Sequence, residues 1–135
     1  MRKSLLEMLF LIACPLAFAQ AGSSAVDKVN AQNNQIFKSG TIIDFYCLIA
    51  SVEHPRAGVM ISCVKPGGRY VMSWGNTLPG DAIHPLKGFG TPEAFEKAAL
   101  TFAPNEIVHA RCIVMPQQSS DQLELYCAPP VKAKQ

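Results

Sequence analysis

The fold is decided by residues 41–63, TIIDFYCLIASVEHPRAGVMISC. Residues 53–57 form a polar, proline-centred turn between two apolar runs. In each run the apolar residues recur at every second position, so they share one face of a β-strand: Ile43, Phe45, Cys47 and Ile49 before the turn, then Val59, Ile61 and Cys63 after it. The stretch therefore predicts a β-hairpin with one cysteine on the apolar face of each strand.

The cysteines predict the register of this hairpin and of a second one. Residue 55, inside the turn, is the midpoint between Cys47 and Cys63, and the midpoint between Cys112 and Cys127 falls in another polar loop. Residues equidistant from the centre of a turn oppose each other, so each cysteine is expected to face its partner. The chain has no Cys-x-x-Cys pair and no zinc-type spacing, and we therefore predict structural disulfides rather than redox or metal chemistry. Four cysteines allow three pairings, and pairing across other strands remains the alternative.

The N-terminus has the pattern of an export signal at residues 1–19. Arg2 and Lys3 precede an apolar run that ends in a small-x-small motif at Ala19, and this run is too short for a membrane-spanning helix. Cleavage after Ala19 leaves an even number of cysteines, which suits a periplasmic or secreted protein. The alternative is a lipobox, Leu-Ile-Ala-Cys, in which Cys14 carries a lipid anchor.

The rest of the chain is divided by its turn and helix signals. Residues 20–35 are small and polar and predict a flexible lead-in; residues 36–128 predict one domain, and residues 129–135 a disordered tail. Further strands are expected at residues 69–74, 106–115 and 122–128. One helix is expected to begin with Thr91 as its cap and Pro92 in its first turn, and to end before Pro104.

This order of elements, three strands, a helix and two strands, resembles the OB-fold of small exported bacterial proteins. Gly40-Thr41-Ile42 and Asn105-Glu106-Ile107-Val108 are similar to the polar-turn entries of the first and fourth strands of such barrels. The resemblance implies a mainly β, five-stranded Greek-key barrel with one short helix. An α+β arrangement, with the helix packed on one antiparallel sheet, is the alternative.

Eight residues are candidates for a binding surface: His54, Arg56, Tyr70, Trp74, His84, His109, Arg111 and Tyr126. The first two lie in the first hairpin loop, where loop polarity alone also explains them. Tyr70 and Trp74 share one face of a strand, which fits either stacking aromatics or core. His109, Arg111 and Tyr126 share a half-apolar face, which fits either a ligand surface or a face covered by the N-terminal segment.

The sequence contains no GxSxG, HExxH or P-loop motif, and the net charge of +2 gives no footprint for nucleic acid. We therefore predict a non-catalytic exported binding or scaffold protein with a partner protein in the cell envelope, and no metal or cofactor. One alternative is an inhibitor or immunity protein against an envelope hydrolase, which inserts residues 75–90 into its target. Another is a small hydrolase or nuclease that uses His84, or His109 with Arg111.

Overall fold

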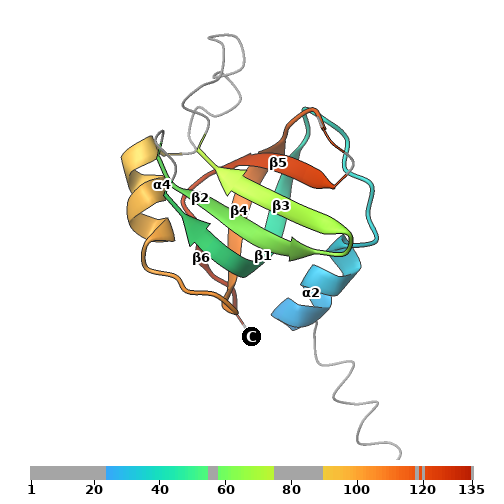
Figure 1. Cartoon of the computed structure of the whole chain (residues 1–135), viewed down its shortest axis with the longest axis horizontal. Helices are drawn as coiled ribbons and strands as arrows, with labels where there is room; N and C mark the ends of the chain where they lie inside the picture. The colour runs from blue at the N-terminus through green and yellow to red at the C-terminus, as the bar shows by residue number, and fades with distance from the viewer. Residues whose placement is uncertain (1–23, 55–57, 75–89, 118, 120, 135) are drawn as a thin grey trace, which may run out of the picture.

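The computed structural model describes residues 24–54, 58–74, 90–117, 119 and 121–134. In this part of the chain, six strands and two short helices are found (Figure 1). In chain order they are α2 (Ala25–Gln32), β1 (Ile42–Glu53), β2 (Met60–Lys65), β3 (Gly68–Ser73), α4 (Pro92–Ala99), β4 (Ile107–Val114), β5 (Gln122–Cys127) and β6 (Val131–Lys132).

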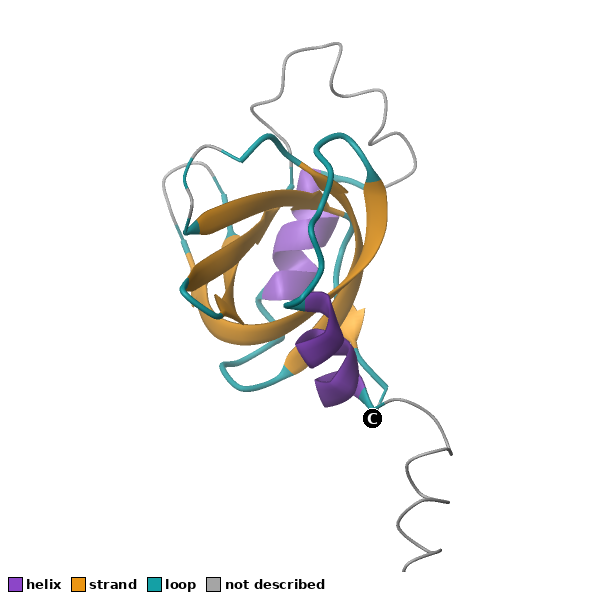
Figure 2. Cartoon of the chain, turned by 90° about the vertical axis from the view of Figure 1, so that its right-hand side faces the viewer, coloured by secondary structure: helices purple, strands orange, loops and turns teal. Residues whose placement is uncertain are grey.

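The strands form a closed barrel because β1 pairs with two neighbours. Its first half, Ile42 to Leu48, pairs with β4, and its second half, from Ile49 to Glu53, pairs with β2. The strand order is β1-β2-β3-β5-β4, and the β1–β4 pairing closes the circle (Figure 2). All pairings are antiparallel except β3–β5, which is parallel. This is the predicted OB-fold-like barrel, and the α+β alternative is wrong because the sheet closes on itself.

Both predicted disulfides are present, but only one has the predicted register. Cys112 and Cys127 are direct partners in the β4–β5 ladder, with Cα atoms 4.0 Å apart. Cys63 instead opposes Ile49. The ladder from Glu53–Met60 to Ser51–Ser62 is centred between residues 56 and 57 rather than on residue 55, and an irregularity between Ile49 and Ser51 then shifts it by one residue. Cys47 still reaches Cys63, with Cα atoms 5.3 Å apart. The bridge therefore runs diagonally. The expectation of directly opposed residues is wrong for this hairpin because the β1–β2 ladder is not centred on residue 55.

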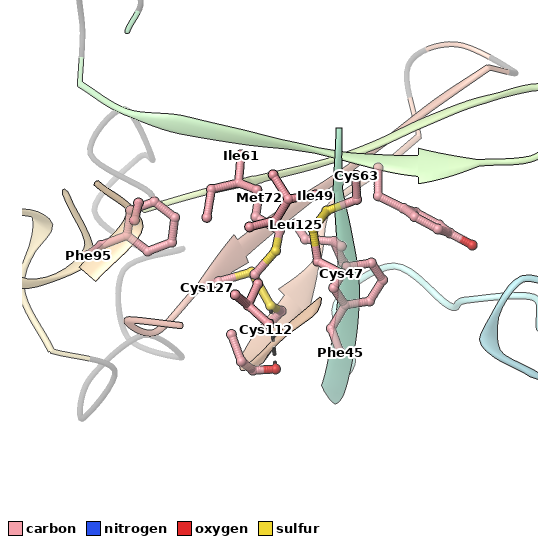
Figure 3. Close-up of a cluster of buried hydrophobic side chains, with 14 of the residues drawn as sticks. Phe45, Cys47, Ile49, Ile61, Cys63, Met72, Phe95, Cys112, Leu125 and Cys127 are labelled. Atoms are coloured by element: carbon pink, nitrogen blue, oxygen red, sulfur yellow. Dashed lines mark hydrogen bonds between the residues drawn. A yellow bond between two sulfur atoms is a disulfide. The ribbon is translucent and has the colours of Figure 1, made fainter. Parts of the chain in front are cut away.

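The two disulfides lie at the centre of the core (Figure 3). All four sulfur-bearing side chains have no solvent exposure. The bridges close loops with sequence separations of 16 and 15 residues, and on the chain-entropy account each stabilises the fold by about 3 kcal/mol. The apolar side chains packed round them include Phe45, Ile49, Ile61, Met72, Phe95 and Leu125.

Helix α4 packs against one end of this core. The Thr91 side chain accepts a hydrogen bond from the Ala94 amide at 3.1 Å, and Pro92 occupies the first turn, as the sequence predicted. Phe95 and Ala99 are the buried face of the helix. The helix ends at Ala99, before Pro104 as expected, and the partly buried Phe102 packs on the core from the segment that follows. In Figure 3, Phe95 lies at the left end of the cluster, apart from the two disulfides.

Two elements were not expected from the sequence. In the predicted flexible lead-in, α2 forms, with a capping box in which Ser24 and Asp27 bond to each other's backbone N–H groups. In the predicted disordered tail, β6 pairs with β4, and Ala133 beyond it is only 5% exposed. Both elements pack on the outside of the barrel, where Ala25, Val29, Ile107 and Ala133 form a second apolar cluster. Both segments are ordered because they pack on the barrel, and the short polar sequences of these segments do not indicate that packing.

Candidate functional site

The first candidate is the outer face shared by β1 and β4. Asp44 pairs with Arg111, and Tyr46 pairs with His109. The rings of Tyr46 and His109 are stacked, with centroids 4.4 Å apart and planes 9° apart. The face therefore carries two of the predicted residues, His109 and Arg111, beside two that the sequence reasoning did not select.

His109 is partly buried at this face. Its Nε2 atom is buried without a hydrogen-bond partner, and lies 3.7 Å from Oδ1 of Asp44. On the other side of the pair, Lys28 of α2 donates to the Tyr46 hydroxyl at 3.0 Å and lies 4.9 Å from the centre of the Tyr46 ring. These contacts attach α2 to the barrel at Tyr46.

Gln32 completes the attachment of α2. Its side-chain amide donates to the Tyr46 carbonyl at 2.7 Å and accepts from the Tyr46 N–H at 3.0 Å, and the residue is only 4% exposed. The β1–β2 ladder begins only at Ile49, so β2 does not pair with Tyr46. The side-chain amide of Gln32 therefore makes the main-chain hydrogen bonds that a neighbouring strand would otherwise make to Tyr46. At Tyr46 these contacts agree with one of the two sequence interpretations of this face, a face covered by the N-terminal segment.

Tyr126 lies farther along the same outer surface, opposite Ile113 in the β4–β5 ladder. Ile113 is buried there among Met115, Tyr126 and Ala128, which are themselves partly buried. This small apolar cluster is separate from the one under α2. Arg111 is exposed and lies in β4 between Ile107 of the first cluster and Ile113 of the second.

The second candidate is a pocket of ≈ 200 Å³ at the mouth of the barrel. Its walls come from the segment after α2, the β2–β3 turn, the start of β5 and the chain after β4. Eight residues line it: Asn33, Gln35, Ile36, Phe37, Lys65, Tyr70, Gln117 and Leu123. Tyr70 and Leu123 are buried and form its floor, whereas Gln35, Ile36 and Gln117 are exposed and form its rim.

Tyr70 is fixed firmly in the floor. Its ring packs edge-on against Phe45 and Phe37, with centroids 5.0 Å and 6.3 Å away. Its hydroxyl donates to Oδ1 of Asn33 at 3.1 Å. Burial raises the pKa of the Tyr70 hydroxyl above its ordinary value of 10.0, so the group is a neutral donor at physiological pH. Of the residues selected from the sequence, Tyr70 is thus both a core residue and a pocket residue.

Lys65 brings the charge of the pocket. Its Nζ lies 5.9 Å from the centre of the Tyr70 ring and donates to the carbonyl of Pro66 at 3.3 Å. Among the described residues, no carboxylate lies within ion-pair distance of this ammonium. Lys65 was not among the candidates chosen from the sequence, because it precedes Pro66, Gly67 and Gly68 and no local pattern distinguishes it from a turn residue.

The remaining predicted residues are not brought together with this pocket. His54 is exposed at the end of β1, and Trp74 is partly buried against the core after β3. Arg56, His84 and residues 75–89 of the long loop lie outside the described residues. In the described part of the chain, no group of three or more His, Cys, Asp or Glu residues is placed to hold a metal ion.

No protein-family model matches the sequence, and no curated protein matches it. Among solved structures, the chain is similar to a protein assigned as an aspartyl-tRNA synthetase from Leishmania major Friedlin, with a TM-score of 0.48 and 10% sequence identity. The similarity covers 78% of this chain and 20% of that protein. A similarity this weak carries no argument about activity.

Proposed function

We propose that the protein is a small exported binding protein that acts, without catalysis, through a macromolecular partner in the cell envelope. The observation that carries this proposal is the pocket at the barrel mouth. Its floor is buried, its rim is exposed, and its lysine has no carboxylate partner among the described residues. A concave site with an apolar floor and a few polar groups is typical of ligand recognition.

Export is supported by the chemistry of the core. Two disulfides are typical of proteins that fold outside the cytoplasm. Among the described residues, no helix has the length and apolar character needed to cross a bilayer. The N-terminal signal belongs to the same proposal: we favour cleavage after Ala19, with lipidation of Cys14 as the alternative. Mass spectrometry of the exported chain distinguishes the two.

Binding is favoured over hydrolysis by the state of His109. A general base must come within hydrogen-bond reach of the proton it removes. The Nε2 atom of His109 is shielded from solvent, and the ring is stacked on Tyr46. This nitrogen is therefore poorly placed to activate a water molecule for the proposed hydrolase alternative.

Site-specific photocrosslinking tests the proposal. The crosslinking residue p-benzoylphenylalanine is introduced in place of Ile36, which is 100% exposed at the pocket rim. A matched variant carries it in place of Leu100, which is 49% exposed beside α4. In cells that export the protein, we expect a discrete adduct from position 36 and none of that size from position 100. Identical adducts from both positions, or none from either, would reject a partner at the mouth.

The identity of an adduct also tests the inhibitor alternative. If the captured partner is an envelope hydrolase whose turnover falls when the purified protein is added, the protein acts as an inhibitor. If the partner's activity does not change, the binding or scaffold role holds.

A further inference from the structure

The charge of the mouth pocket is one-sided. Of its eight lining residues, Lys65 is a cation and none is a carboxylate. Three lining residues, Asn33, Gln35 and Gln117, carry amide groups that can donate hydrogen bonds. Within the described residues, Lys65 donates to one carbonyl, that of Pro66, and a lysine has three donors. The pocket thus offers hydrogen-bond donors and one positive charge.

The other surfaces of the pocket are apolar. Leu123 lies in the floor, Phe37 is half-buried, and Ile36 is fully exposed at the rim. The pocket volume of ≈ 200 Å³ exceeds that of the cavity of about 150 Å³ which is known to accept benzene in another protein. A bare inorganic anion would leave these apolar walls in water. The pocket therefore suits an anionic group attached to a small apolar group.

We propose that the mouth pocket binds a carboxylate carried by a small apolar group, with Lys65 and the rim amides on the carboxylate and Leu123, Phe37 and Ile36 around the apolar part. The inference rests on the binding function proposed above and names the chemistry of its site. One lysine balances one negative charge, which favours a carboxylate over a doubly charged phosphate. The same chemistry occurs at the carboxyl end of a protein chain and in a free small acid.

Titration of the disulfide-intact chain with paired probes tests the inference, with NMR and calorimetry as readouts. N-acetyl-leucine is compared with N-acetyl-leucinamide, and a short peptide ending in leucine with the same peptide amidated at its carboxyl end. Inorganic phosphate is the third probe. We expect the acids to bind, the amides to bind at least tenfold more weakly, and signals of Gln35 and Gln117 to shift on binding.

Two lysine variants show whether Lys65 binds the negative charge of the acids. Lys65→Met keeps an unbranched stem over Tyr70 and removes the ammonium, and it is expected to weaken binding of the acids at least tenfold. Lys97→Met removes an exposed lysine from α4 and is expected to leave binding unchanged. Equal losses in both variants would mean that net charge, not the pocket, attracts the acids, and would overturn the inference.

The probes also separate the sources and the two proposals. Tighter binding of the peptide than of N-acetyl-leucine assigns the carboxylate to a chain end, whereas equal binding assigns it to a free acid. Equal affinity for acids and amides, stronger binding of phosphate, or no binding of any probe would overturn the inference that the pocket binds a carboxylate. If the adduct at position 36 persists in that case, the partner function stands. If the acids bind and no adduct forms, the pocket serves a free acid and the partner function fails.

Discussion

Replacement of Gln32 by alanine should release α2 from the barrel. The Gln32 amide makes two hydrogen bonds to the main chain of Tyr46, at 2.7 Å and 3.0 Å, from a position that is only 4% exposed. Alanine removes both bonds and leaves the Tyr46 N–H and C=O without these partners. Gln32→Glu keeps the length of the side chain but replaces the donor to the Tyr46 carbonyl with an acceptor, so it should be no milder than alanine.

The size of the effect follows from the bonds lost. Each hydrogen bond contributes about 1 kcal/mol net, so the two contribute about 2 kcal/mol to the docking of α2. Alanine has a slightly higher helix propensity than glutamine, which offsets only a few tenths of a kcal/mol. A loss of about 2 kcal/mol corresponds to a roughly 30-fold rise in the population of the opened state.

Hydrogen exchange under native conditions measures this opening directly. The amide of Tyr46, which donates to Gln32, should exchange about 30-fold faster in Gln32→Ala, while amides in the stapled β4–β5 ladder should change less. Asn30→Ala is the matched control, because Asn30 is exposed on the same helix, and it should leave the exchange rate of Tyr46 within about twofold. An unchanged rate in Gln32→Ala, or equal acceleration in both variants, would refute the role assigned to this amide.

Two further predictions concern the barrel and its mouth. A Cβ at Gly68 would overlap the backbone carbonyl of Asp121, where β3 meets β5, so Gly68→Ala should lower the free energy of unfolding in urea by about 2 kcal/mol or more; an unchanged midpoint would contradict the close approach. Burial raises the pKa of Tyr70 above its ordinary value of 10.0, so the folded state binds the phenolic proton more tightly than the unfolded state does. The contribution of this group to the free energy of unfolding is therefore fully present below pH 10 and is lost as the pH rises above 10. Urea titrations at pH 9 to 11 should show this loss in the native chain and not in Tyr70→Phe.

The barrel could be predicted because its signals are local. Alternation in residues 41–63, the cap at Thr91 and the spacing of the cysteines each report on a few neighbouring residues. The register of β4 and β5 followed from the midpoint between Cys112 and Cys127. The register of β1 and β2 did not, because the ladder beside the turn pairs Glu53 with Met60 and is not centred on residue 55. A bulge between Ile49 and Ser51 then shifts the register by one residue, so that Ile49 and Val52 both pack on the core.

The packing of α2 on the outer face of β1 and β4 could be predicted only as one of two alternatives. Alternation placed His109 and Arg111 on an outer face, but it could not say what covers that face. The Ser24–Asp27 capping box was a local signal for α2, yet eight residues are too few to form a stable helix in isolation. The deciding interactions, from Gln32 and Lys28 to Tyr46, join residues 14 and 18 positions apart, beyond the reach of periodicity.

The mouth pocket depends on positions still farther apart in sequence. Tyr70 and Asn33 are separated by 37 residues, and Leu123 reaches Tyr70 through the parallel β3–β5 pairing. Tyr70 was selected as a stacking aromatic or a core residue, and it proves to be a core residue whose hydroxyl end lines the pocket. Nothing local marks Lys65, because a lysine beside Pro-Gly-Gly has the composition of an ordinary solvated turn.

The disulfides and the pocket are nevertheless connected through one row of the barrel. Cys63 is the ladder partner of Tyr70, and Tyr70 is the ladder partner of Leu123. The bridge from Cys47 to Cys63 therefore anchors the row of side chains that forms the pocket floor. A floor held in place before binding does not have to be ordered by the ligand, which lowers the entropic cost of recognition. Cysteines without chemistry of their own thus fix the geometry on which the proposed recognition depends.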